Sequence, residues 1–228
     1  MKEFIKTSAG ILLLIAGIVG FLTLLRYLDR QPSVVLTDAI CEPPCWHGIQ
    51  PGKTNVTQVF DILDGMESVN QATIAGEDGQ DGWPVEIFWA FQRPAEDSTG
   101  SVFFKDRQVT AISILTVNSL SLEDLFEKYG QPEQYWAEIG YGENREYLDV
   151  VLLFPTRSLL ADVVIDIADG ASQVEIKPTT PVFRVTYFDP QMFAELLGTR
   201  ILIDKPASAR TGSFQTWPGF GIISFERK

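Results

Sequence analysis

Two cysteines and one histidine stand close together near the start of the chain, in the pattern C-x-x-x-C-x-H. They are Cys41, Cys45 and His47, and the 228 residues include no other cysteine or histidine. Thiolate and imidazole groups are ligands that suit zinc or copper. A c-type haem requires C-x-x-C-H, so this spacing excludes it. The cysteines also suit a disulfide, because an even pair bonds in an oxidising compartment and the two intervening prolines bend the loop closed.

We favour a disulfide between Cys41 and Cys45 and keep two alternatives open. One is a zinc or copper site formed by Cys41, Cys45 and His47, and the other is a pair of unbonded thiols. Any nucleophilic triad would have to use His47, which lies in a proline-rich stretch rather than on a rigid element. We therefore expect no catalytic residue, no cofactor and no enzymatic activity.

The stretch HGIQPGKTNV resembles a phosphate-binding loop at first sight. Such a loop needs G-x-x-x-x-G-K-[ST], because the intervening backbone N–H groups curl round the phosphates. Here only three residues separate Gly48 from Gly52, and the preceding CEPPCW cannot form a buried strand. We therefore predict no nucleotide binding, and we interpret Gly52-Lys53-Thr54 as the turn before a helix.

Acidic residues outnumber basic ones along the chain, and the net charge is −12. The first 30 residues carry +2, so the remainder carries −14, from 14 basic and 28 acidic side chains. A surface with this balance repels the phosphates of nucleic acids. The 45% of hydrophobic residues predicts a substantial core. We expect a folded protein that binds no nucleic acid.

The N-terminus carries an apolar run, TSAGILLLIAGIVGFLTLL, between Lys6 and Arg26. As a helix, this run would rise about 28 Å, close to the roughly 30 Å of a bilayer's hydrocarbon core. Because no small-x-small site precedes Arg26, an uncleaved anchor is favoured over a cleaved signal peptide. The sequence predicts a single-pass membrane protein whose body lies outside the cytoplasm. Residues 1–30 would form the tail and anchor, and residues 31–52 a proline-rich tether.

Two segments have the pattern of short amphipathic helices. The first begins at Asn55 and ends near Gly65, and the second begins at Ser121 and ends at Gly130. Their apolar positions are Val56, Val59, Phe60 and Leu63 in the first, and Leu122, Leu125, Phe126 and Tyr129 in the second. Strand-like runs follow each helix, at 85–91, 101–104 and 109–117 and then at 147–154, 159–167 and 181–188. The pattern predicts an α+β fold of tandem helix-plus-antiparallel-sheet repeats, at 53–118 and 119–228.

The second helix, SLEDLFEKYGQP, resembles a signature of the BamE/SmpA-OmlA and beta-lactamase-inhibitor-protein-like group. The matching positions are Ser121, Leu125, Tyr129, Gly130 and Pro132, and the first helix shares Gly52 and Thr54 but lacks the proline after Gly65. Members of this group are small exported α+β modules that bind proteins, and the inhibitor protein holds two such units in tandem. The resemblance implies a protein-binding module with that fold.

The run VEIFWAF predicts a strand whose two sides differ. Its odd-numbered positions, among them Ile87 and Trp89, form an apolar side, and Phe88 points to the other side. We expect Phe88, together with Trp46, to belong to a binding surface. The whole sequence predicts a membrane-anchored, extracytoplasmic protein-binding or scaffold module of the cell envelope, whose partners are the membrane and another protein. The alternative is a thiol or metal-handling domain built on Cys41, Cys45 and His47.

Overall fold

The computed structural model divides the chain into two compact units, Met1–Pro32 and Ser33–Lys228. In the first unit it describes residues 17, 18 and 20 only. In the second unit it describes residues 33–36, 41–79, 84–92, 99–116, 119–142, 145–168, 170–199, 201–203 and 213–225.

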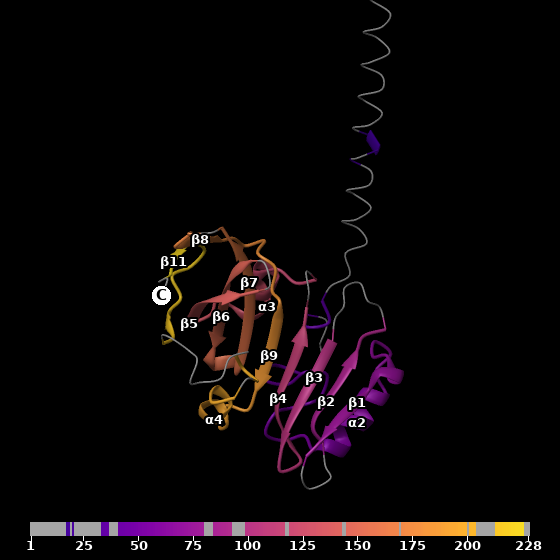
Figure 1. The fold of residues 1–228 in the computed structure, drawn as a ribbon. Coiled ribbons are helices and arrows are strands. Elements are labelled where there is room, and N and C mark those ends of the chain that lie inside the picture. Colours follow the sequence, from indigo (N-terminus) through magenta and orange to yellow (C-terminus); the bar gives the residue numbers. More distant parts are fainter. Residues whose placement is uncertain are drawn as a thin grey trace, which may run out of the picture. The chain divides into compact units, whose positions relative to one another are not determined.

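The described residues of the second unit form mainly strands, with three short α-helices and two 3-10 turns (Figure 1). The helices are α2 (Val56–Asp64), α3 (Leu122–Tyr129) and α4 (Phe193–Leu197). The strands are β1 (Ala75–Asp78), β2 (Pro84–Ala90), β3 (Thr99–Lys105), β4 (Gln108–Leu115), β5 (Gln134–Tyr141), β6 (Glu146–Phe154), β7 (Leu159–Ile167), β8 (Gln173–Ile176), β9 (Arg184–Phe188), β10 (Gln215–Thr216) and β11 (Gly221–Ser224).

The first two helices begin and end where the sequence predicts. Asn55 caps α2 and Ser121 caps α3, and each cap forms a capping box with the residue three positions on. The caps satisfy backbone N–H groups that have no partner inside the helix. Gly130 ends α3 with φ of +83°, a conformation that a residue with a Cβ rarely adopts. Local sequence signals therefore determine both helices.

Nine strands form one antiparallel sheet in the order β1-β2-β3-β4-β9-β7-β6-β5-β10, and β8 pairs with β11 separately. The strands that follow α2 occupy one half of the large sheet, and strands that follow α3 occupy the other. The two halves join where β4 pairs with β9, from Ala111 opposite Phe188 to Leu115 opposite Arg184. The β4–β9 pairing satisfies the backbone groups of two strands that would otherwise be sheet edges.

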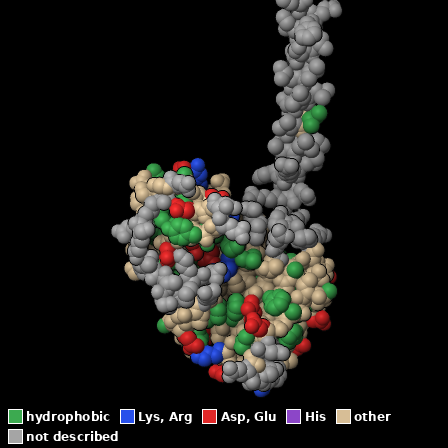
Figure 2. Space-filling view, in the orientation of Figure 1, with side chains coloured by type: hydrophobic (Ala, Val, Ile, Leu, Met, Phe, Trp, Pro, Cys, Tyr) green, Lys and Arg blue, Asp and Glu red, His purple; other side chains and the backbone are tan. Residues whose placement is uncertain are grey.

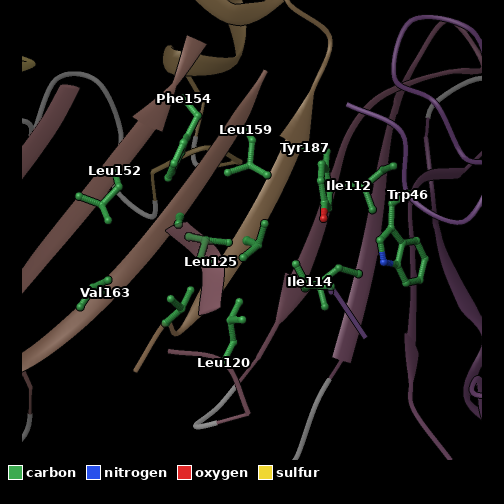
Figure 3. Close-up of a cluster of buried hydrophobic side chains, with 14 of the residues drawn as sticks. Trp46, Ile112, Ile114, Leu120, Leu125, Leu152, Phe154, Leu159, Val163 and Tyr187 are labelled. Carbon is green, nitrogen blue, oxygen red and sulfur yellow. The ribbon is translucent and has the colours of Figure 1, made fainter. Parts of the chain in front are cut away.

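The predicted fold of tandem helix-plus-sheet repeats is therefore wrong. Both halves share one sheet, and both helices pack on the same hydrophobic core, which contains Leu63 of α2 and Leu125 of α3. Figure 3 shows this core running along the sheet from Leu152 and Val163 to Ile112 and Trp46. The boundary predicted between residues 118 and 119 lies inside one compact unit.

The predicted proline-rich tether, residues 31–52, is also part of the packed unit wherever the structure describes it. Val35, Trp46 and Ile49 have no exposed surface and belong to the main core. Trp46 and Ile49 exchange backbone hydrogen bonds of 2.9 and 2.8 Å, which close a tight turn. Burial of large apolar side chains is favourable enough to hold this segment against the sheet.

No helix among the described residues combines the length and the apolarity needed to cross a bilayer. The nine residues of α2 rise only about 14 Å, less than half the thickness of the hydrocarbon core. Most of the predicted span, residues 7–25, lies outside the described residues. The predictions of a transmembrane anchor, of the membrane as a partner and of a single-pass location are corrected on this finding, because no described helix could cross a bilayer.

Candidate functional site

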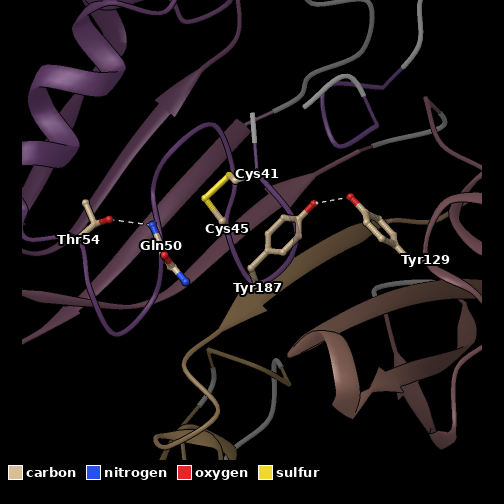
Figure 4. The surroundings of a disulfide bond; sticks show 6 residues. All are labelled: Cys41, Cys45, Gln50, Thr54, Tyr129 and Tyr187. Carbon is tan, nitrogen blue, oxygen red and sulfur yellow. Dashed lines mark hydrogen bonds between the residues drawn. A yellow bond between two sulfur atoms is a disulfide. The ribbon is translucent and has the colours of Figure 1, made fainter. Parts of the chain in front are cut away.

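The cysteine pair forms a disulfide in the structure. Cys41 and Cys45 are joined through their sulfur atoms, with their Cα atoms 5.7 Å apart, and no cysteine in the described part of the chain is free (Figure 4). Bonded sulfur atoms cannot act as thiolate ligands. No group of three or more His, Cys, Asp or Glu side chains within the described ranges is arranged to hold a metal ion. The geometry therefore gives no support to the alternative metal site at Cys41, Cys45 and His47.

Trp46 follows the disulfide directly and is buried in the core. Its ring stacks on Trp89 of β2, with 5.6 Å between centroids, and meets Phe91 edge-on at 6.3 Å. The prediction that Trp46 belongs to a binding surface is therefore wrong, because none of its surface is accessible. His47 lies beside it with a left-handed backbone, φ +47°, and its ring contacts the Trp46 ring at 4.8 Å. The segment is thus anchored by the indole ring of Trp46, which enters the core directly after the disulfide-closed loop.

The stretch from His47 to Val56 is a turn that leads into α2, and its backbone donors from Ile49 onward are already used. The N–H groups of Ile49, Gln50, Gly52, Lys53, Thr54 and Asn55 all donate hydrogen bonds within the protein. One of these, from Gln50 to the Thr54 hydroxyl at 2.8 Å, is drawn in Figure 4. Gly52 has φ of +79°, and a Cβ there would lie 2.9 Å from the Asp189 carboxylate. Because these amides are engaged, the turn cannot cradle a phosphate.

The large sheet has two faces with different cover. On one face, α2 and α3 pack on residues such as Ile87 and Ile114, and this is the main core. On the other face, α4 and residues 201–203 form a second hydrophobic cluster with strands β4, β5, β6, β7 and β9. Phe188 and Phe193 stack at 5.0 Å within it, and Phe103 of β3 packs against its edge. Lys105, at the end of β3, marks the rim of this cover through a 2.6 Å ion pair with Glu195 of α4.

Beyond that rim, no described helix or strand covers the second face over β1, β2 and the adjoining side of β3. We define the β1–β3 surface by the residues that share this side in register: Ala75, Glu77, Glu86, Phe88, Ser101 and Phe103. Phe88 lies directly opposite Ala75 on one side and Ser101 on the other. Because both neighbours are small, the Phe88 ring is not covered and remains 44% exposed. In Figure 2, hydrophobic and acidic side chains lie next to one another over this half of the sheet.

Sequence reasoning found Phe88 but did not identify its surroundings. Alternation along β2 predicted that Phe88 lies on the other face of the strand from Ile87 and Trp89. In the structure Phe88 is exposed and the other two side chains are buried. The register with β1 and β3, which brings Glu77 and Phe103 to either side of Glu86, depends on long-range pairing. Strand β1 itself was not predicted.

An ion pair in the middle of the sheet has no counterpart among the features predicted from the sequence. Asp162 of β7 lies opposite Arg184 of β9, and the Arg184 Nε atom donates to the Asp162 carboxylate. Their side chains are 5% and 17% exposed. A lone arginine in the otherwise mostly apolar run PVFRVTYF, which forms β9, is the sequence signal that indicates a buried partner.

Comparison with known proteins provides no family assignment. No family model matches the sequence, and no curated protein matches it. Among solved structures, a cysteine-rich secretory protein from Staphylococcus aureus is similar over 78% of this chain and 56% of its own, with 10% identity and a TM-score of 0.32. This chain thus spans little more than half the length of that protein, and a likeness at this level says nothing about activity.

Proposed function

We propose that this protein is a protein-binding or scaffold module without catalytic activity, and that its contact surface is the β1–β3 surface centred on Phe88. The observation that carries the proposal is the exposed Phe88 ring, which stands between two small neighbours on the part of the sheet that α4 leaves open. Aromatic side chains in such positions are the usual anchors of protein interfaces.

The surroundings of Phe88 support a contact surface rather than a flaw in packing. Phe103 lies half-buried beside it on the same face, so the apolar area extends beyond one ring. Polar side chains, from Glu77 to Ser101, border this area as the rim of an interface does. The resemblance of α3 to modules that bind proteins is consistent with this proposal, although it concerns the opposite face of the sheet.

The proposal is tested by a pull-down with matched variants. Tagged full-length protein is cross-linked in the cells that produce it, and the captured proteins are quantified by mass spectrometry for wild type, Phe88→Ser and Phe60→Ser. Phe60 is the control because it is equally aromatic and 41% exposed, but lies on α2, which packs on the other face of the sheet. A partner that is captured by wild type and Phe60→Ser and is lost with Phe88→Ser is the expected result.

Equal capture by all three proteins would disprove a role for Phe88. Both substitutions replace exposed side chains, so we expect each to change the free energy of unfolding by less than about 0.5 kcal/mol. A thermal unfolding curve for each variant separates loss of binding from loss of fold.

A further inference from the structure

Two carboxylates face each other directly on the β1–β3 surface. Glu77 of β1 and Glu86 of β2 are partners in the antiparallel register, so both side chains project from the same face. Glu77 is exposed and Glu86 is half-buried. Like charges directly opposite in a sheet destabilise it, because their Cβ atoms lie only about 5 Å apart. The pair therefore needs a reason to be there other than the stability of the free protein.

No cation within the described residues relieves this repulsion. None of the ion pairs seen in that part of the chain includes Glu77 or Glu86. Lys105, at the end of the neighbouring strand β3, forms its ion pair with Glu195 of α4. A positively charged group from outside would find two adjacent carboxylates with no competing partner among the described residues, and the −14 charge of residues 31–228 would draw it in at long range.

The same two carboxylates border the apolar part of the surface. Glu86 lies opposite Phe103 and two positions from Phe88 along β2. A segment that places an apolar side chain on Phe88 would therefore bring its neighbouring residues over Glu86 and Glu77. We infer that the β1–β3 surface binds a protein segment in which lysine or arginine residues flank an apolar side chain. This inference rests on the function proposed above and names the chemistry of its partner.

A second copy of this chain does not suit the surface. A two-fold contact through the same patch would place Glu77 and Glu86 of one copy against those of the other, adding repulsion. Extension of the sheet at β1 does not suit it either. That strand has four residues, and its register with β2 shifts between Glu77 and Asp78, which is a feature that blunts sheet edges. The partner therefore lies across the face of the sheet.

The test measures the binding of labelled peptides to the full chain by fluorescence anisotropy. The probe is a short peptide that alternates lysine with leucine, and the comparison peptides alternate glutamate with leucine and lysine with serine. We expect the lysine–leucine peptide to bind most tightly, and its affinity to fall as salt is added. Failure of this peptide to bind, or equal binding of all three, would overturn the inference.

Paired variants then locate the binding. Glu77→Gln combined with Glu86→Gln should lower the affinity for the lysine–leucine peptide about fivefold, as expected for the loss of two partly exposed ion pairs. The control combines Glu123→Gln with Glu127→Gln, which changes the net charge equally at exposed positions of α3, on the other side of the sheet. The control should bind as wild type does, and an equal loss in both double variants would contradict the inference, because binding would then follow net charge alone.

Phe88→Ser distinguishes failure of this inference from failure of the proposed protein-binding function. If Phe88→Ser weakens binding of the lysine–leucine peptide and the Glu77/Glu86 double variant does not, the surface binds a partner but has no preference for cations. If neither variant weakens binding of the peptide, the contact surface lies elsewhere, and both proposals are wrong.

Discussion

The hydroxyl groups of Tyr129 and Tyr187 lie 3.2 Å apart in the core and join α3 to β9 (Figure 4). Tyr129 also donates to the backbone oxygen of Val35, at 3.1 Å. Because a tyrosine hydroxyl has one proton, Tyr187 must be the donor in the pair of tyrosines. This relay connects the segment that precedes the disulfide, a helix and a central strand.

Removal of the Tyr129 hydroxyl should destabilise the protein. Tyr129→Phe removes one buried hydrogen bond to Tyr187 and one to the Val35 carbonyl, which keeps the Lys128 ammonium at 3.3 Å, so the free energy of unfolding should fall by about 1–3 kcal/mol. Chemical denaturation measures this loss. Tyr141→Phe is the control, since Tyr141 is 69% exposed and its hydroxyl is open to water, and it should change stability by less than about 0.5 kcal/mol. Equal curves for the two variants would contradict the relay.

The two helices should respond differently to loss of an aromatic ring. Phe126 of α3 contacts Phe154, Trp217 and Phe220, with ring centroids 5.1–6.1 Å apart. Because it is half-buried, Phe126→Ala should cost about 2–3 kcal/mol, somewhat less than a fully buried phenylalanine. Phe60→Ala should cost less than about 0.5 kcal/mol, because Phe60 is exposed, contrary to the sequence prediction that it packs. Thermal unfolding of both variants checks the difference, and an equal loss would mean that Phe60 is packed.

Burial of Trp46 should contribute more to stability than the disulfide beside it. Trp46→Ala empties a site in contact with Trp89 and Phe91, and should lower the free energy of unfolding by about 3–5 kcal/mol. The Cys41–Cys45 bridge closes a very short loop, so Cys41→Ser combined with Cys45→Ser should cost only about 2 kcal/mol in the chain-entropy model. Urea titrations of the two variants compare the losses. A larger loss in the serine variant would show that the bridge, rather than the indole ring, holds the segment.

Removing one partner of the Asp162–Arg184 pair should lower the free energy of unfolding more than replacing both partners by leucine. Arg184→Leu leaves a carboxylate buried in the sheet, and such a change typically costs about 3–5 kcal/mol. The double variant Asp162→Leu with Arg184→Leu removes both charges, so it should be more stable than Arg184→Leu alone. Denaturation curves of the two proteins give the comparison. A double variant less stable than the single variant would show that the pair contributes net stability.

The sequence by itself determined the features that depend on neighbouring residues. The caps at Asn55 and Ser121 define two helices, because a capping box involves residues only three positions apart. Alternation along β2 placed Phe88 away from the core, because successive side chains in a strand point to opposite faces.

Tertiary structure decided the rest. The β4–β9 pairing, which joins residues 69 to 77 positions apart, turned the expected repeats into one sheet. Docking of the Cys41–Gly52 segment buried Trp46, and register between strands placed Asp162 beside Arg184 and Glu77 beside Glu86. Each of these contacts joins residues that are distant in the sequence. The free energy that stabilises them comes from burial of apolar side chains and strand pairing across the whole sheet rather than from local conformational preference.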